Sequence, residues 1–297
     1  MASPDGAVGS TLHAATEHLR ASGSPTARLD AEVLLAHVAG RDRAWVLAHP
    51  EAELEADAGS ELQAALARRA AGEPIAYIRG FKEWRSLRIL TDPRALIPRP
   101  ETELLAEAAM AEIAERLTRD GDSIVAREVA TGSGAVAVAL AIRFRSALAL
   151  ERMTLVASDV SLEALELAAE NLELHGVEGL LTLACADLLG AAGDSLPRPD
   201  VVIANLPYVA SAEVDARQGS LGYEPRVALD GGPDGLMLLR GLLDALPTRA
   251  ASGATVFLEI GIGQVDAIAA LAPPGWSLSV VPDLAGLDRV VRLGMPD

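Results

Sequence analysis

The chain has 297 residues, enough for two domains, and half of them are hydrophobic, so it can bury a sizeable core and is not disordered as a whole. Its 42 acidic residues outnumber 25 lysines and arginines, which gives a formal net charge of −17. Such a surface repels phosphate backbones, so we expect no direct nucleic-acid binding, whereas a basic protein partner would be attracted.

Features of location and assembly point to a cytoplasmic protein, expected to be a monomer. The first ten residues carry no basic patch followed by an apolar stretch, and no segment approaches roughly 18 uninterrupted apolar residues, so no membrane association is expected. The only cysteine, Cys185, lies in an apolar run and is expected to be a buried structural thiol. The five histidines are scattered without metal-ligand spacing, so we expect no metal site.

Residues 1–75 are predicted to form a small domain of about four helices. Ser24 and Pro25 provide a cap and a first-turn proline for a helix that Gly40 closes, and the helical pattern repeats from Glu61 until Gly72 ends it. These residues contain no pattern typical of a strand.

Residues 76–100 are predicted to link two domains. Aromatic and branched residues around Gly80, in segments 76–84 and 87–90, predict a β-hairpin. Pro93, Pro98 and Pro100 then keep the chain extended until Glu101 begins a helix.

Residues 101–297 alternate between helices and strands, which predicts an α/β sheet. The expected helices cover 101–118, 135–147, 161–174, 234–246 and 264–272, and the expected strands cover 124–130, 153–158, 180–185, 200–204, 254–260, 277–281 and 288–293. Continuous apolar strands are typical of a parallel sheet covered on both faces, whose ligands bind beyond the carboxyl ends of the strands. The one long irregular stretch is 209–233.

Two of these strand ends predict a nucleoside site. Gly132 and Gly134 follow the first strand of this region and let the backbone approach a ligand at a helix N-terminus. Asp159 ends the next strand, where a carboxylate can accept hydrogen bonds from ribose hydroxyls. Each feature also has a plain structural interpretation, as a tight turn and as a helix cap, but together they indicate a nucleoside cofactor.

The segment from Asn205 to Tyr208 predicts the chemistry. The Asn205 side-chain oxygen and the Leu206 carbonyl can accept both N–H bonds of a planar substrate NH2 group, Pro207 fixes the turn, and Tyr208 stacks on the planar group. Two acceptors on one nitrogen draw its lone pair out of conjugation, as methylation of a poor nitrogen nucleophile requires. A plain turn is the alternative interpretation, since asparagine and proline are common turn residues.

At these residues the chain resembles class I S-adenosylmethionine-dependent methyltransferases, and among them the HemK/PrmC family of protein-(glutamine-N5) methyltransferases that act on peptide chain release factors. The resemblance spans nearly the whole chain. It rests on Gly72-Glu-Pro-Ile-Ala-Tyr-Ile-Arg-Gly80, Leu96-Ile-Pro-Arg-Pro-Glu-Thr-Glu-Leu104, Thr131-Gly-Ser-Gly-Ala135, Asn205-Leu-Pro-Tyr208, Glu224-Pro-Arg-Val-Ala-Leu-Asp-Gly-Gly-Pro-Asp-Gly-Leu236, Leu258-Glu-Ile260 and Asp283-Leu-Ala-Gly-Leu-Asp-Arg289.

The resemblance implies an architecture. It implies a Rossmann-like α/β fold with a seven-stranded, mostly parallel sheet, a small all-α N-terminal domain and a linking β-hairpin. Residues 1–75 would then dock the release factor, 76–100 would be the hairpin and extended linker, and 101–297 would bind S-adenosylmethionine.

The resemblance also implies roles for single residues. Asp159 would hold the ribose, and Asp187 with Leu188 would border the adenine. Asn205, Pro207 and Tyr208 would be catalytic and, with Leu206, would bind the acceptor glutamine amide. The remaining cofactor-binding residues, with Asn205 beside them, would be Glu128, Ala130, Thr131, Gly132, Ser133 and Gly134.

Two departures from the family pattern leave alternatives open. Ala130 stands where the family has glycine, which would weaken cofactor binding if that position needs a positive φ. Leu206 gives Asn-Leu-Pro-Tyr, the form found in ribosomal RNA adenine dimethyltransferases, in place of Asn-Pro-Pro-Tyr. The alternatives are the same chemistry on a ribosomal-protein glutamine or a small-molecule amide, a nucleic-acid adenine N6-methyltransferase, and a non-catalytic cofactor-binding protein.

Overall fold

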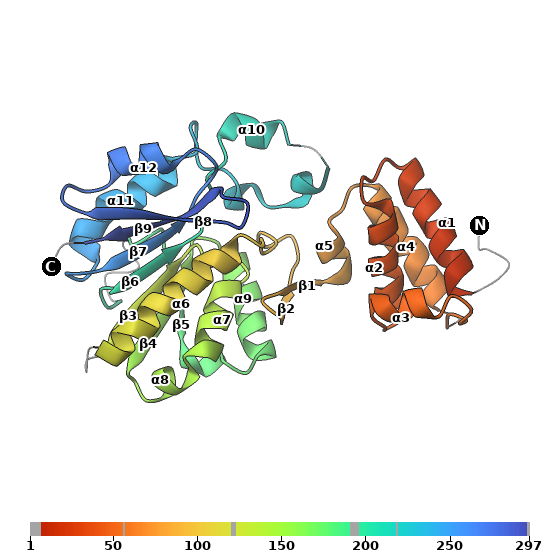
Figure 1. Cartoon of the computed structure of the whole chain (residues 1–297), viewed down its shortest axis with the longest axis horizontal. Helices are drawn as coiled ribbons and strands as arrows, with labels where there is room; N and C mark the ends of the chain where they lie inside the picture. Colours follow the sequence, from red (N-terminus) through yellow and green to blue (C-terminus); the bar gives the residue numbers. More distant parts are fainter. Residues whose placement is uncertain (1–6, 56, 120–122, 191–195, 218, 296–297) are drawn as a thin grey trace. The chain divides into compact units, whose positions relative to one another are not determined.

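The computed structural model describes residues 7–55, 57–119, 123–190, 196–217 and 219–295. The chain divides into two compact units, Met1–Phe81 with Gln218–Tyr223 and Lys82–Arg217 with Glu224–Asp297. Figure 1 shows the first as a group of helices and the second as a sheet with helices on both faces. No helix in the described ranges is long and apolar enough to cross a membrane.

The first unit is a helical bundle around one apolar core. Its helices are α1 (Val8–Ala21), α2 (Ala27–Val38), α3 (Arg43–Ala48), α4 (Ala58–Ala70) and α5 (Ile75–Arg79). Leu12, Leu34 and Leu66, from three different helices, are almost fully buried in this core. The buried Asp30 carboxylate is paired with Arg69, with 2.8 Å between Oδ2 and Nε, and this attraction compensates the cost of removing the charge from water.

The start of α2 corrects the sequence interpretation. The residue that caps the helix is Thr26, and Ser24 lies before it. The Ser24 hydroxyl donates to Asp30 Oδ2 at 2.8 Å, and its oxygen accepts from the N–H of Thr26, which lies before the first residue of the helix. The helix therefore begins two residues later than its cap signal predicted.

A segment from far along the chain completes the helical unit. A 3₁₀ helix over Gly219–Tyr223 packs against the link between α4 and α5. The Tyr223 hydroxyl donates to the Ala71 carbonyl, and the Ser220 hydroxyl donates to the Gly72 carbonyl, both at 3.0 Å. Together with α10 (Ser211–Asp215) and a 3₁₀ turn over Arg226–Ala228, it gives short helical structure to the stretch expected to be irregular.

The second unit contains the predicted seven-stranded sheet. Its strands are β3 (Ile124–Val129), β4 (Met153–Asp159), β5 (Thr182–Cys185), β6 (Val201–Ala204), β7 (Thr255–Glu259), β8 (Ser277–Pro282) and β9 (Asp288–Gly294). Their order is β5-β4-β3-β6-β7-β9-β8, parallel from β5 to β7, with β9 antiparallel to both of its neighbours. The class I methyltransferase architecture is confirmed. Strands β4 and β5 are added on one side of β3, and β6 and β7 on the other, so the order of the strands switches at β3. An α/β sheet opens a ligand crevice at such a switch point.

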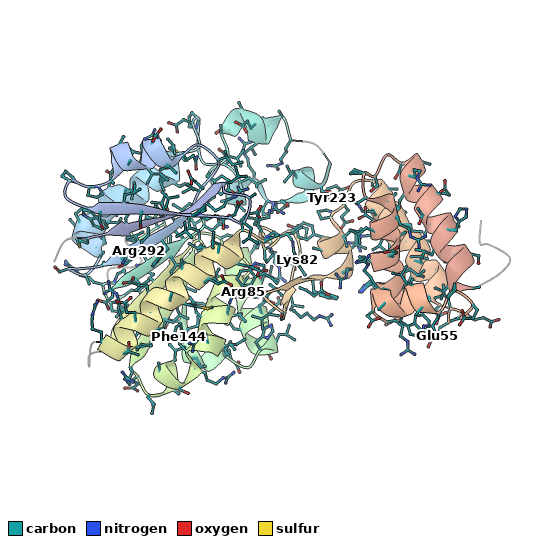
Figure 2. All side chains as sticks on the ribbon, in the orientation of Figure 1. Glu55, Lys82, Arg85, Phe144, Tyr223 and Arg292 are labelled. Atoms are coloured by element: carbon teal, nitrogen blue, oxygen red, sulfur yellow. The ribbon has the colours of Figure 1, made fainter. Side chains whose placement is uncertain are left out.

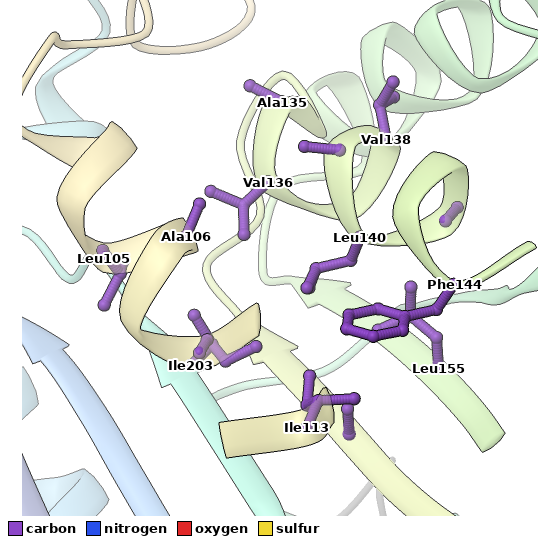
Figure 3. Close-up of a cluster of buried hydrophobic side chains, with 14 of the residues drawn as sticks. Leu105, Ala106, Ile113, Ala135, Val136, Val138, Leu140, Phe144, Leu155 and Ile203 are labelled. Carbon is purple, nitrogen blue, oxygen red and sulfur yellow. The ribbon is translucent and has the colours of Figure 1, made fainter. Parts of the chain in front are cut away.

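Alternate residues of the central strands feed two separate cores. Val201 and Ile203 of β6 face α6 (Thr102–Arg119), α7 (Ala135–Arg143) and α9 (Leu162–Leu174), whereas Val202 and Ala204 face α11 (Met237–Arg249) and α12 (Val265–Leu271). Figure 3 shows the first core, where Leu140, Phe144 and Leu155 lie together. This double cover explains the unbroken apolar sequence of the strand.

Residues 76–90 correct the hairpin prediction in part. Residues 75–79 form α5, and Gly80 ends that helix with φ +74°. The hairpin itself is β1 (Phe81–Trp84) and β2 (Leu87–Leu90), with its turn at Arg85. Arg85, labelled in Figure 2, pairs with Glu107 of α6 at 2.8 Å, which ties the turn to the α/β unit.

Two other expectations in the α/β unit were wrong. The helix predicted over 135–147 breaks at Phe144 into α7 and α8 (Arg145–Ala149): Phe144 has φ −111° and ψ 22°, outside the helical region, and its side chain is buried in the core. Cys185, expected to be buried, is exposed. It lies on β5, an edge strand whose residues are only partly covered, and the position of a strand within a sheet is invisible in its own residues.

Candidate functional site

A cavity of about 760 Å³ lies at the carboxyl ends of the central strands, as the switch point predicts. The ends of β3, β4 and β6 and the turn after β5 contribute to its wall, and a loop before α6 covers part of it. Both predicted sites, the nucleoside site and the acceptor site, open into this one cavity.

The turn after β3 depends on three left-handed residues. Ala130, Gly132 and Gly134 have φ values of +57°, +55° and +76°. A Cβ on Gly134 would lie 3.0 Å from Ala168 Cβ, so α7 can approach α9 this closely only with glycine here. Ala130, unlike the two glycines, has a Cβ atom, so its left-handed backbone costs about 1–2 kcal/mol.

The Asp159 carboxylate connects two turns of the cavity wall. Its Oδ2 accepts a hydrogen bond from the Gly132 N–H and its Oδ1 from the Ser161 N–H, both at 2.9 Å. Burial raises the pKa of Asp159, although these amide bonds counteract the rise. Each carboxylate oxygen has a further lone pair, so Asp159 can still accept from hydroxyl groups in the cavity.

Glu128 is a buried acid on the same wall. Only 4% of the residue is exposed, and burial, with a smaller contribution from the Asp159 carboxylate, raises the pKa of Glu128 to about 8. Its Oε2 atom is buried and has no hydrogen-bond partner in the described part of the chain. Glu128 is therefore largely protonated at neutral pH and has hydrogen-bonding capacity left for a ligand.

Asn171 supports the turn from behind and was missed by the sequence interpretation. Its fully buried amide donates to the Ser133 carbonyl at 2.9 Å and to the Leu90 carbonyl at 3.1 Å, and accepts from the Leu90 N–H at 2.7 Å. It thereby fastens the hairpin, α9 and the turn to one another. The only available signal was a polar residue on the apolar face of a predicted helix.

Asn205 takes part in a buried chain of hydrogen bonds. Its Nδ2 donates to Thr102 Oγ1 at 3.2 Å, and the Thr102 hydroxyl donates to Glu259 Oε2 at 2.6 Å. Thr102 begins α6 and Glu259 ends β7, so three elements meet here. Burial raises the pKa of Glu259 to about 7, and the Glu101 carboxylate adds to the rise, whereas the Thr102 hydroxyl and the Arg289 and Arg99 guanidinium groups lower it.

The glycine-rich segment after residue 229 supports the backbone of Pro207 and Tyr208. A Cβ on Gly231 would lie 2.6 Å from the Pro207 carbonyl oxygen, and a Cβ on Gly235 would lie 2.3 Å from that of Tyr208. Gln264 Nε2 also donates to the Tyr208 carbonyl at 3.3 Å. No other residue type fits at these two glycines without moving the turn that follows β6.

The structure brings most of the predicted site residues together on the cavity wall. Two do not line it: Gly134, which is the N-cap residue of α7, and Tyr208, whose ring lies beside Gly261. Burial, followed by the nearby Glu259 carboxylate, raises the pKa of Tyr208 to about 12. The predicted residues that line the cavity are Glu128, Ala130, Thr131, Gly132, Ser133, Asp159, Asp187, Leu188, Asn205, Leu206 and Pro207.

An ion pair that sequence patterns did not reveal holds the loop before α6. Arg99 Nη2 lies 2.6 Å from Oε1 of Glu224, of which 3% is exposed. The second oxygen of Glu224 accepts from the Ile97 N–H at 3.1 Å. Arg99 lies in the family-like segment 96–104 and Glu224 in the segment 224–236, and this shared family pattern was the only indication of the pair in the sequence.

Comparisons with known proteins give one consistent result. Residues 10–80 match the family model described as the PrmC N-terminal domain. A release factor glutamine methyltransferase from Koribacter versatilis is 36% identical over 93% of this chain and 94% of its own length. Another, from Moorella thermoacetica, is 37% identical over 94% and 95%.

A solved structure is similar in fold alone. The hMettl16 catalytic domain, crystallised with the MAT2A 3'UTR hairpin 1, is 11% identical to this chain, with a TM-score of 0.50 over 84% of each chain. The identity is too low to carry any function, so the likeness bears only on the α/β architecture.

Proposed function

Because the chain belongs to the release factor glutamine methyltransferase family, we propose that it transfers a methyl group from S-adenosylmethionine to the side-chain amide nitrogen of a glutamine in a class I peptide chain release factor. The observation that carries this proposal is Asn205. Its side chain lies on the wall of the cavity, with its nitrogen hydrogen-bonded to Thr102. That bond leaves the amide oxygen available as an acceptor for a substrate N–H.

The residues of the first half of the cavity fit S-adenosylmethionine, the methyl donor of this family. The buried Glu128 Oε2 lacks a partner in the described chain, and the cationic methionine end of the cofactor would favour the ionised form of this carboxyl and pair with it. Asp159 has lone pairs left for the ribose hydroxyls, and Leu188 with Val160 gives an apolar surface for a purine. When bound, the cofactor supplies an electrophilic methyl group on a sulfonium.

In the second half, hydrogen bonds prepare the acceptor nitrogen. Asn205 Oδ1 and the Leu206 carbonyl accept the two N–H bonds of the glutamine amide, and Pro207 fixes the backbone of this turn. These bonds strengthen as the nitrogen becomes tetrahedral, so they stabilise the transition state more than the bound substrate. The amide proton becomes acidic as the N–C bond forms and leaves to water, and no covalent enzyme intermediate is involved.

The helical unit is proposed as the docking element for the release factor. Support comes from the match of residues 10–80 to the PrmC N-terminal domain and from the acidity of the chain, which suits a basic partner. Cross-linking of the full-length Asn205→Ala protein to a release factor, followed by mass spectrometry, tests the role. Cross-links confined to the α/β unit, residues 82–217 and 224–297, would contradict it.

Methylation of a nucleic-acid adenine is the second candidate, and Leu206 is the observation that favours it. Asn-Leu-Pro-Tyr suits the exocyclic amino group of adenine as well as an amide. Residues 82–297, however, carry 31 acidic side chains against 18 lysines and arginines. A nucleic-acid substrate needs a cationic surface, so the protein substrate is favoured.

Mass mapping of the methylated product tests the proposed function. The protein is incubated with isotopically labelled S-adenosylmethionine and a purified release factor, with ribosomal proteins and RNA in parallel reactions. We expect one added methyl group on a single release-factor glutamine, and none with Asn205→Ala. Label in RNA, or in ribosomal proteins alone, would refute the assignment of the substrate.

A further inference from the structure

We propose that Thr102 and Glu259 are positioning residues that fix which atom of the Asn205 amide faces the substrate. The inference rests on the proposed function, because it concerns the same acceptor site. In it, the buried chain from Asn205 through Thr102 to Glu259 holds Nδ2 away from the cavity, so that Oδ1 meets the substrate NH2 group.

The problem that this chain solves is the near symmetry of a carboxamide. A half-turn about the last side-chain bond exchanges the oxygen and the nitrogen of Asn205 with almost no change of shape. In one orientation the site offers an acceptor to the substrate nitrogen, and in the other it offers a second NH2 group. Only the partners on the far side of the amide decide between the two.

Glu259 sets the direction of the hydrogen bonds. An ionised carboxylate can only accept, and the Thr102 hydroxyl has one proton, which it donates to Glu259 over 2.6 Å. Thr102 Oγ1 must then act as the acceptor toward Asn205, at 3.2 Å, and only Nδ2 can donate to it. A charge-assisted bond of this kind is among the stronger ones in a protein.

Burial protects these hydrogen bonds from water. Thr102 and Glu259 are 6% and 5% exposed, so water competes little for these bonds. The parallel pairing of β6 with β7 sets Ala204 opposite Leu258, which brings Asn205 and Glu259 to the same end of the sheet. Thr102 joins them as the first residue of α6.

The protonation state of Glu259 controls the chain. Once protonated, Glu259 can donate to Thr102, whose own proton is then free to turn toward Asn205 and accommodate the reversed amide. The charged and titratable groups around Glu259 are Glu101 at the start of α6, Arg99 in the loop before it, Arg289 of β9 and Tyr208 after β6. Because the pKa of Glu259 lies near 7, acidification through neutral pH is expected to lower kcat.

A pair of matched variants tests the hydroxyl. Thr102→Val keeps the shape but removes the hydrogen bonds, whereas Thr102→Ser keeps the hydroxyl. We expect single-turnover methylation of a release factor to fall about 10- to 100-fold in Thr102→Val, with unchanged cofactor Kd, and to stay within about 3-fold in Thr102→Ser. A Thr102→Val protein that binds cofactor and methylates at the wild-type rate would overturn the proposal.

Glu259→Gln tests the titration. Glutamine still offers an oxygen to the Thr102 hydroxyl but does not change charge, so the fall in kcat below about pH 7 should disappear.

Asn205→Asp places a second carboxylate beside the single Thr102 proton and should be poorly active. The double variant Asn205→Asp with Glu259→Gln should recover activity, since the introduced glutamine can donate to Thr102 and Thr102 to the new aspartate. An unchanged pH profile, or a double variant no more active than Asn205→Asp, would contradict the positioning role.

A spectroscopic readout separates this inference from the proposed function. The side-chain NH2 signals of Asn205, identified by their loss in Asn205→Asp, report its bond to Thr102 without any turnover. They should shift in Thr102→Val and between pH 6 and pH 8, and the pH-dependent shift should vanish in Glu259→Gln. If wild-type protein methylates no release factor, the proposed function fails and these signals still decide the inference. Signals that ignore Thr102 and pH would refute it.

Discussion

The turns after β3 and after β6 face the same cavity but treat their polar atoms in opposite ways. At the end of β3, the buried Glu128 Oε2 has no hydrogen-bond partner among the described residues. After β6, Asn205 and the two buried residues behind it are joined in one chain of hydrogen bonds. The first turn leaves hydrogen-bonding groups available for a ligand, whereas in the second turn such groups bond to one another and hold one amide in place.

The difference corresponds to what each side must do. A charged cofactor can compensate the cost of buried polar atoms by hydrogen-bonding to them. A glutamine amide is a weak nucleophile, so its site gains more from a fixed orientation than from spare hydrogen bonds.

The largest effect is expected at the acceptor turn. Asn205→Ala removes the side-chain acceptor whose bond strengthens in the transition state, so kcat should fall about 10²- to 10³-fold. Single-turnover methylation of a release-factor domain measures this loss, and calorimetry with S-adenosylhomocysteine should show an almost unchanged Kd. A turnover rate near that of the wild type would mean that the segment 205–208 is only a turn.

At the cofactor turn the loss should appear in binding. Asp159→Ala removes the acceptors for the ribose and the bonds to Gly132 and Ser161, so cofactor Kd should rise about 10- to 100-fold, from about 1–3 kcal/mol of lost hydrogen bonding. Thermal unfolding with S-adenosylmethionine is the measurement, and NAD, which should produce no shift, is the control. If the stabilisation by S-adenosylmethionine survives in Asp159→Ala, the nucleoside pocket lies elsewhere.

The buried acid of the cofactor turn should make stability depend on pH. The pKa of Glu128 is about 8 in the folded state and lies near its usual 4.5 in the unfolded chain, so the folded state binds more protons between these values. Stability from this group is therefore lost as pH rises toward 8, by about 1.4 kcal/mol per unit. The free energy of unfolding, measured with urea, should therefore fall between pH 6 and pH 8 by about 2 kcal/mol less in Glu128→Gln than in the wild type.

The matched control is Glu107→Gln on α6, where the side chain is largely exposed. Its loss of stability over the same pH range should equal that of the wild type. Parallel curves for all three proteins would show that Glu128 is not the titrating group.

The contrast between the turns also explains which parts of the site were visible in the sequence. Gly132, Gly134 and Asp159 lie within one strand-turn-helix-strand unit, so local patterns predicted them together. Thr102 and Glu259 lie 157 residues apart in the chain and meet only because β6 pairs with β7 and α6 packs on them. Their segments matched the family pattern, but no local rule indicated what either side chain does.

Local patterns likewise predicted the elements of the fold, but not the features that depend on long-range pairing. Apolar runs of strand length between helical patterns predicted the seven strands of the sheet, and in the central strands β6 and β7 these runs reflect burial on both faces. Cys185 was misjudged because its exposure depends on β5 being the edge of the sheet, which long-range pairing decides. The break at Phe144 was missed because a ring that turns into the core leaves no mark in the helical pattern.

The smallest effect is expected at Ala130, the one non-glycine residue among the left-handed positions of the cofactor turn. Its φ of +57° is strained for alanine, so Ala130→Gly should stabilise the protein by about 1 kcal/mol, less the entropy that glycine returns to the unfolded chain. The melting temperature should therefore rise by a few degrees at most. The matched control is Ala111→Gly, at an exposed position inside α6, where the same change should lower stability by about 0.5–1 kcal/mol. Cofactor affinity should stay equal or improve in Ala130→Gly, since the turn keeps its shape and loses a methyl group. If both variants destabilise the protein equally, the left-handed backbone at Ala130 carries no strain, and this departure from the family pattern has no energetic cost.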